Sequence, residues 1–183
     1  GGVTPESMPI MIQKGANMFV CGSSTLFRPP EKVVENCTAL REKIDSKSWA
    51  KGFEKLRNGD DGCLLATGYM THTAMSVAET LSDKFNLTVI DLFNLSDFDR
   101  DALVSNLGEY KQIFSLEEGF SNRGGLDAIM YELLGEIRLQ QNFCGIGVKP
   151  GYNFELGTRQ ELHELVGIGH NAVCSKIIGR FAT

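Results

Sequence analysis

Short apolar runs alternate with amphipathic stretches over most of this chain, from residue 60 to residue 183. Apolar runs of strand length occur at residues 62–67, 87–93, 112–117 and 143–148. Between them, apolar residues recur at helical spacing over residues 71–85, 97–107 and 124–137. Strands that alternate with helices are typical of a sheet covered by helices on both faces. The sequence therefore predicts an α/β fold, a three-layer sandwich with a mainly parallel sheet.

Two further helices are predicted to close this domain. The first begins at Thr158, whose hydroxyl can cap the helix while Glu161 completes a capping box. The second begins near Asn171 and ends by Arg180. Together with the alternating segment, these helices define a predicted domain of residues 60–183.

Charge and cysteine usage exclude several classes of function. The net charge is −5 and no basic run is present, so nucleic acid is not an expected partner. No stretch approaches the roughly 20 apolar residues that cross a bilayer, so no membrane association is expected. The cysteines are odd in number and have no paired spacing, which favours reduced thiols and a cytoplasmic location. A start at Gly1 without methionine suggests a fragment of a longer protein.

A separate pattern occupies residues 1–44. A helix is predicted from Thr4, a buried strand at residues 16–21, and a second helix at residues 33–44. The strand leads into a loop in which a glycine backbone and two hydroxyls can bind phosphate oxygens, at Gly22, Ser23 and Ser24. The alternative is that this loop is only a strand-to-helix turn.

This first segment resembles a known family. Gly-Gly-Val-Thr-Pro-Glu-Ser at residues 1–7 and Lys-Gly-Ala-Asn-Met-Phe-Val-Cys-Gly-Ser-Ser-Thr-Leu-Phe at residues 14–27 resemble the last two βα units of ribulose-phosphate 3-epimerase, a (β/α)8 barrel. The resemblance implies a phosphate-binding site made by Gly1, Gly2, Gly22 and Ser23, with Ser24 as a further donor. The family's divalent-metal ligands lie before Gly1, so the segment is expected to bind no metal and to lack the acid and base of an epimerase.

The alternating segment resembles a second family. The resemblance rests on four sequence segments. In chain order they are Leu-Leu-Ala-Thr-Gly at residues 64–68, Val-Ile-Asp-Leu at 89–92, Ser-Leu-Glu-Glu at 115–118 and Gly-Thr-Arg-Gln-Glu-Leu-His-Glu-Leu-Val-Gly-Ile at 157–168. They resemble the C-terminal domain of transketolases, which pyruvate dehydrogenase and deoxyxylulose-phosphate synthase share. The resemblance implies a domain that packs beside the cofactor domains and supports a dimer. Thiamine diphosphate with magnesium would then be bound by the preceding domains and not by this chain.

One weak ligand site is predicted at the carboxyl end of the strand at residues 112–117. Glu118 follows that strand, and Arg123, Gly124 and Gly125 lead into the next helix. Open α/β sheets bind ligands at such strand ends. The alternative is that Glu118 caps loop amides and that the two glycines only permit a tight turn.

The three histidines are not expected to hold a metal ion. His72, His163 and His170 fall on different predicted elements and have no metal-ligand spacing. His163 is expected to be an exposed surface residue, and His170 is expected to cap a helix.

Residues 45–59 join the two parts of the chain. A short amphipathic linker helix is predicted over residues 46–56, with Trp49 and Phe53 docking the first segment onto the sheet. The alternative is a flexible linker. The strand at residues 16–21 needs a neighbour, which is either the edge of the α/β sheet or the same strand of a second copy.

No catalytic residue is predicted in this chain. The two resemblances indicate the non-oxidative pentose phosphate pathway, because the epimerase product, xylulose 5-phosphate, is a transketolase donor. We therefore expect the non-catalytic C-terminal portion of an epimerase/transketolase-like fusion with a scaffold or dimer-support role. Its expected partners are upstream catalytic domains or a second copy of the chain. The alternative is a regulatory module that binds a sugar phosphate or a partner protein.

Overall fold

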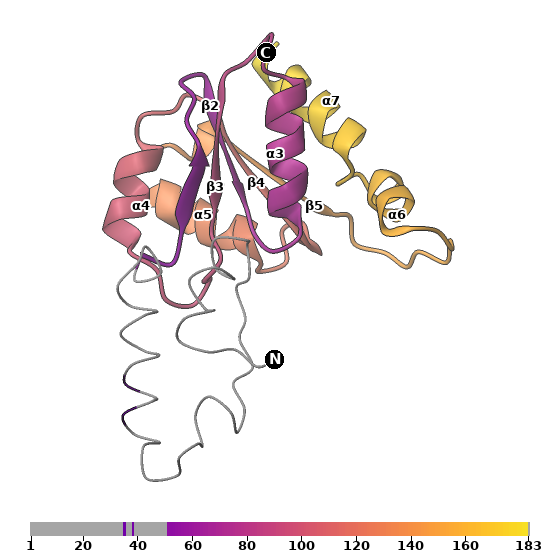
Figure 1. Ribbon diagram of the computed structural model, residues 1–183, viewed down its shortest axis with the longest axis horizontal. Helices are drawn as coiled ribbons and strands as arrows, with labels where there is room; N and C mark the ends of the chain where they lie inside the picture. The colour runs from indigo at the N-terminus through magenta and orange to yellow at the C-terminus, as the bar shows by residue number, and fades with distance from the viewer. Residues whose placement is uncertain (1–34, 36–37, 39–50, 183) are drawn as a thin grey trace. The chain divides into compact units, whose positions relative to one another are not determined.

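The computed structural model describes residues 35, 38 and 51–182 (Figure 1). The chain divides into two units, residues 1–51 and 52–183, and nearly all the described residues belong to the second. The predicted barrel fragment of residues 1–44 lies outside the described residues, except for Glu35 and Thr38, which are helical. The predicted phosphate-binding residues Gly1, Gly2, Gly22, Ser23 and Ser24 all lie outside the described residues as well.

Five strands form one mixed sheet in the described part of the chain. They are β1 (Glu54–Arg57), β2 (Gly62–Ala66), β3 (Leu87–Asp91), β4 (Ile113–Phe120) and β5 (Phe143–Val148). Their order across the sheet is β1-β3-β2-β4-β5. β1 pairs antiparallel with β3, and all other neighbours pair in parallel. The predicted α/β fold with a mainly parallel sheet is thereby confirmed.

Helices cover both faces of this sheet (Figure 1). α3 (Met70–Thr80) and α7 (His170–Phe181) pack on one face, and α4 (Arg100–Leu107) and α5 (Leu126–Glu136) pack on the other. β2 shows why both faces are covered, because all its residues are buried and its side chains alternate between the faces. Leu64 and Ala66 pack with α3 and α7, whereas Cys63 and Leu65 pack with α4 and α5.

The remaining helices contribute no fully buried residue to the two cores. η3 (Gln140–Asn142) is a short 3-10 turn before β5, and α6 (Arg159–Val166) has no buried residue. Its Val166 is half-buried against the core on the α3/α7 face, and polar and ring contacts of Arg159 and His163 add to its position. Within residues 51–182, no helix is both long and apolar enough to cross a membrane.

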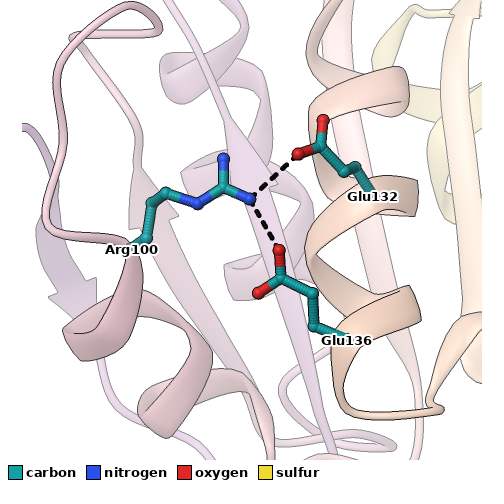
Figure 2. A network of polar contacts seen from close by, with 3 residues as sticks. All are labelled: Arg100, Glu132 and Glu136. Carbon is teal, nitrogen blue, oxygen red and sulfur yellow. Dashed lines mark hydrogen bonds and ion pairs between the residues drawn. The ribbon is translucent and has the colours of Figure 1, made fainter.

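An ion-pair network joins the two helices of the α4/α5 layer (Figure 2). Arg100 Nη2 donates to Glu132 at 3.0 Å and to Glu136 at 2.8 Å. The two glutamates are four residues apart on α5, so they share one face of that helix. Hydrogen bonds to Glu136 and Glu132 raise the pKa of Arg100 above its ordinary value. All three side chains are exposed, so the network positions α4 against α5 and adds little to stability.

β1 corrects the prediction of a linker helix over residues 46–56. Residues 46–50, with Trp49, lie outside the described residues, but Glu54–Arg57 form a strand that pairs with β3. Phe53 is only 5% exposed and packs in the core on the α4/α5 face. The second unit therefore begins at Gly52, ahead of the predicted start at residue 60.

Capping residues fix where α4 and α6 begin. Asp99 caps α4 by accepting the Ala102 N–H at 2.9 Å, so this helix begins at Arg100 and not at residue 97. The predicted capping box of α6 is confirmed, because the Thr158 hydroxyl accepts the Glu161 N–H at 3.3 Å and Glu161 accepts the Thr158 N–H at 2.8 Å. The hydrogen bonds from the backbone and then the hydroxyl of Thr158 lower the pKa of Glu161.

Candidate functional site

The strand order places a topological switch point between β2 and β4. From β2 the chain crosses to β3 on one side, and from β3 it crosses to β4 on the other side of β2. In open α/β sheets, ligands bind in the crevice beyond the carboxyl ends of the two strands at such a point. Tyr69 follows β2 here, and Glu118 lies near the carboxyl end of β4.

Side chains of α6 occupy this crevice. His163 Nε2 lies 2.9 Å from Glu118 Oε1, and Arg159 Nε lies 3.4 Å from the same oxygen. The Arg159 guanidinium also stacks over the Tyr69 ring, with Cζ 4.2 Å from the ring centroid. The His163 ring meets Tyr69 edge-on at a centroid distance of 5.7 Å. The chain thus places a guanidinium, an imidazole and a phenol ring at its own switch point.

This cluster of Tyr69, Glu118, Arg159 and His163 differs from the sequence expectations in two respects. The His163 side chain is only 12% exposed, so the expectation of an exposed surface residue is wrong. Arg159 and Tyr69 were not among the predicted site residues. The spacing of Arg159 and His163 was the available signal, because residues four apart on a helix share a face.

Glu117, the neighbour of Glu118 on β4, holds the N-terminus of α5. Glu117 is 6% exposed, and its Oε1 accepts the Asp127 N–H at 3.1 Å. A Cβ atom at Gly125, the N-cap residue, would come within 2.7 Å of Glu117 Cδ, so a larger residue would have to displace the Glu117 carboxylate from the helix N-terminus. Gly124 has φ of 96°, which also favours glycine. The tight turn is confirmed, whereas ligand binding by Gly124, Gly125 and the exposed Arg123 stays a prediction.

The predicted weak site is split between two places. Glu118 faces α6, whereas Gly124 borders a cavity of about 470 Å³ that also has Asp127 and Glu132 in its wall. Asp127 is 6% exposed and accepts the Asn122 N–H through Oδ2. The structure therefore does not bring Glu118 together with the glycine turn into one pocket.

All three histidines line one cavity of about 220 Å³ between α3, α6 and α7. His170 Nδ1 lies 3.2 Å from Ser76 Oγ, and Nε2 lies 3.2 Å from Thr80 Oγ1, so this side chain ties α7 to α3. His170 is the first residue of α7 and Gly169 is its N-cap, so the expected capping role is wrong. Among the described residues, no group of three or more histidines, cysteines and acidic side chains could hold a metal ion.

Asp91, at the carboxyl end of β3, has a perturbed carboxyl group. Burial raises its pKa, and a hydrogen bond from Thr71 Oγ1 at 3.0 Å opposes that shift. Because the folded pKa lies above the unfolded one, the contribution of Asp91 to stability is fully present below the unfolded pKa. It is lost as the pH rises through the folded pKa.

Replacing Asp91 by asparagine is therefore expected to stabilise the protein at neutral pH and to have little effect at low pH. Asparagine keeps an acceptor for Thr71 and has no charge to desolvate. Urea midpoints from about pH 3 to pH 7 measure the difference. Asp83→Asn, at an exposed position after α3, is the matched control. An Asp91→Asn effect that is equal at both ends of this range would contradict the prediction.

Comparisons with known proteins agree with this architecture. The family model of the transketolase C-terminal domain matches residues 52–173. The 1-deoxy-D-xylulose-5-phosphate synthase of Chlamydia muridarum is 27% identical over 164 residues, which cover 87% of this chain and 26% of the relative. The same enzyme of Chlamydia trachomatis serovar L2 is 30% identical over 129 residues, 70% of this chain and 20% of the relative. The chain thus spans about a quarter, or less, of the length of these curated relatives.

Solved structures show the same relationship. A split-gene transketolase, solved as an inactive β4 tetramer, superposes with a TM-score of 0.62 and 25% identity, over 73% of this chain and 43% of that one. Transketolase from Campylobacter jejuni shares the fold, with a TM-score of 0.52 and 17% identity over 73% of this chain and 19% of that one. The family match covers β1 to β5, α6 and the start of α7. The chain therefore belongs to the transketolase C-terminal domain family.

Proposed function

We propose that this domain is a non-catalytic supporting part of a thiamine-diphosphate enzyme of the transketolase and 1-deoxy-D-xylulose-5-phosphate synthase class. The observation that carries the proposal is the set of contacts at the switch point, where Arg159 and His163 of α6 contact Glu118. A ligand of an open α/β sheet would need that place, and α6 puts an arginine and a histidine there. Cofactor binding and catalysis then belong to the parts of the enzyme that lie outside the match.

The relatives support the same proposal. The split-gene transketolase to which the chain is similar is described as an inactive tetramer of β chains. By analogy, the present chain assembles with copies of itself or with cofactor-binding domains and lacks activity alone. Those domains would hold thiamine diphosphate with magnesium.

The purified chain is expected to show neither turnover of sugar phosphates nor binding of thiamine diphosphate with magnesium. Calorimetry with the cofactor and a coupled assay with xylulose 5-phosphate measure these two properties. The complementary experiment uses a hybrid of the C. muridarum synthase in which residues 52–183 of this chain replace the matching segment. The hybrid is expected to retain activity, whereas the synthase truncated before that segment is expected to lose it. Turnover by the chain alone, or a folded but inactive hybrid, would contradict the proposal.

The finer part of the proposal concerns pathway and location. The resemblance of residues 1–44 to ribulose-phosphate 3-epimerase supports a fusion that belongs to the pentose phosphate pathway, with a sugar phosphate as ligand of that segment. Cys63, Cys144 and Cys174 are free thiols, and burial raises the pKa of Cys63. Free thiols used as small apolar residues support a cytoplasmic location.

A further inference from the structure

The first turn of α5 holds a buried carboxylate that has one unused acceptor atom. Asp127 is 6% exposed, and its Oδ2 accepts the Asn122 N–H. Its Oδ1 is buried and accepts no hydrogen bond from any described residue. A buried acceptor without a donor destabilises a fold, so nearly all such atoms in folded proteins have a partner. Asp127 Oδ1 therefore needs a donor that the described part of the chain does not supply.

Ser115 of β4 is a second buried polar side chain without a partner. It is fully buried, and its Oγ makes no hydrogen bond to the described residues. Gly145 of β5 lies in register with Ser115. A Cβ atom at Gly145 would lie 3.6 Å from Ser115 Oγ, 3.6 Å from Asp127 Oδ2 and 3.0 Å from Asp127 Cβ. Both side chains therefore border the same glycine, and a larger residue there would crowd them.

A cavity of about 470 Å³ adjoins this place, and both Asp127 and Gly145 line it. Cavities that bind small molecules commonly have roughly 300–1,000 Å³. The wall comes from the loop after β4, from α5 and from β5, so a ligand here would touch three parts of the domain. The cavity is separate from the switch point, because neither Glu118 nor any residue of α6 lines it.

The charges in the wall of the cavity favour a cation. Two carboxylates, Asp127 and Glu132, line it, and no lysine, arginine or histidine is among the described residues that do so. Glu132 already pairs with Arg100 at 3.0 Å, so Asp127 is the carboxylate that has an unused oxygen. A phosphate ester in this cavity would meet carboxylates and no basic side chain. The wall therefore selects a positively charged ligand.

Two aromatic residues in the same wall favour an organic cation over a bare metal ion. Tyr131 is 57% exposed, Phe143 is half-buried, and both line the cavity. Aromatic rings attract ammonium groups and cover the apolar part of such a ligand. A bound metal ion usually has several protein ligands, and no group of three or more suitable side chains in the described residues could hold one.

We propose that this cavity binds a small organic cation, a primary ammonium that carries an alkyl or aryl group. The ammonium donates to the Asp127 carboxylate, and the apolar group lies against Tyr131 and Phe143. The terminal torsion of an aspartate side chain is soft, so a modest turn of the carboxylate brings Oδ1 to the cavity. Ser115 Oγ offers a second acceptor on the sheet side of the same place. The inference goes beyond the proposed supporting role and does not rest on it.

The test is an NMR titration of the isotope-labelled full chain with n-butylammonium chloride at constant ionic strength. We expect saturable shifts of the Asn122, Asp127 and Gly145 amides, with a dissociation constant in the roughly millimolar range for so small a ligand. Two matched probes separate charge from hydrogen bonding. The alcohol n-butanol keeps the alkyl group without the charge, and tetramethylammonium keeps the charge without an N–H. Each is expected to bind at least about tenfold more weakly.

Asp127→Asn tests the carboxylate, because asparagine still accepts the Asn122 N–H and has no charge. We expect this variant to bind n-butylammonium at least about tenfold more weakly. Its matched control is Asp101→Asn, the same change at an exposed position in the first turn of α4, where the affinity should stay within about twofold. Tyr131→Ser changes an exposed part of the wall, so the fold should stay intact while binding weakens about two- to fivefold.

Shifts that do not saturate, or that spread over amides far from the cavity, would overturn the proposal. Equal affinities for n-butylammonium and either matched probe would overturn it too, as would an Asp127→Asn chain that binds as tightly as the unchanged one. Displacement of n-butylammonium by Mg²⁺ at equal concentration would assign the cavity to a metal ion instead. If Asp127→Asn does not fold, Tyr131→Ser decides alone, and an unchanged affinity in that variant rejects the proposal.

Discussion

Replacing Phe114 by alanine is expected to lower the free energy of unfolding by about 3–5 kcal/mol. Phe114 lies on β4, fully buried, in register with Leu64 of β2 on one side and Cys144 of β5 on the other. Its ring packs 6.1 Å from the ring of Phe181 on α7. The truncation therefore opens a cavity between the sheet and α7. With total stabilities of about 5–15 kcal/mol, such a loss leaves a marginal fold.

Phe120→Ala on the same strand is the matched control for Phe114→Ala. Phe120 is 50% exposed, so its truncation removes little buried surface and should cost less than about 1 kcal/mol. Urea unfolding followed by circular dichroism measures both variants. Equal losses for the two phenylalanines would show that Phe114 is not at the centre of the core.

The alternation of the sequence was sufficient to predict the parallel part of the sheet. The runs at β2, β3, β4 and β5 are short and apolar because helices cover both faces, and buried parallel strands have this composition. β1 could not be predicted in this way. Glu54–Arg57 is a charged segment of four residues, and pairing with the exposed edge of β3 makes it a strand. That pairing is a tertiary effect that local spacing does not record.

The candidate site was predictable only in part. Glu118 could be named from its place at a strand end, but the residues that meet it are Arg159 and His163, more than forty positions later. Their meeting depends on how residues 149–158, between β5 and α6, return the chain toward β4. The spacing of apolar residues in the sequence does not predict the path of the chain between β5 and α6. The same reason explains why His163 was expected on the surface, since its flanking glutamates are typical of a solvated helix face.

The chain between β5 and the end of α6 differs in exposure from one end to the other. Arg159 and His163 contact Glu118 at the place where a ligand of this fold would bind. Tyr152 and Phe154, a few residues earlier, project outward without burial. One end of this segment is thus held by contacts within the domain, and the other presents apolar side chains to solvent. This division supports the proposed role of the domain.

Gly59→Ala is the second substitution expected to have a large effect, a loss of about 3 kcal/mol or more. Sequence spacing placed Gly59 at the end of a linker, but the structure packs it tightly against the start of β3. A Cβ atom there would collide with the backbone of Asn86 and would lie 2.5 Å from the carbonyl carbon of Leu87. A backbone collision cannot be relieved by turning a side chain, so the strand itself must move.

The movement would also break a buried set of hydrogen bonds. Thr88 Oγ1 accepts the Gly59 N–H at 2.8 Å, donates to Gly59 O at 2.8 Å, and lies 2.9 Å from Tyr110 Oη. A buried N–H left without its acceptor costs about 1–3 kcal/mol on its own. Gly108→Ala is the matched control, because its Cβ would lie at an ordinary 3.6 Å from Val104 O and its φ of −59° suits alanine. We expect that variant to be neutral or stabilised by up to about 1 kcal/mol. If Gly59→Ala unfolded at the same urea concentration as Gly108→Ala, residues 52–59 would be a linker after all and not part of the folded domain.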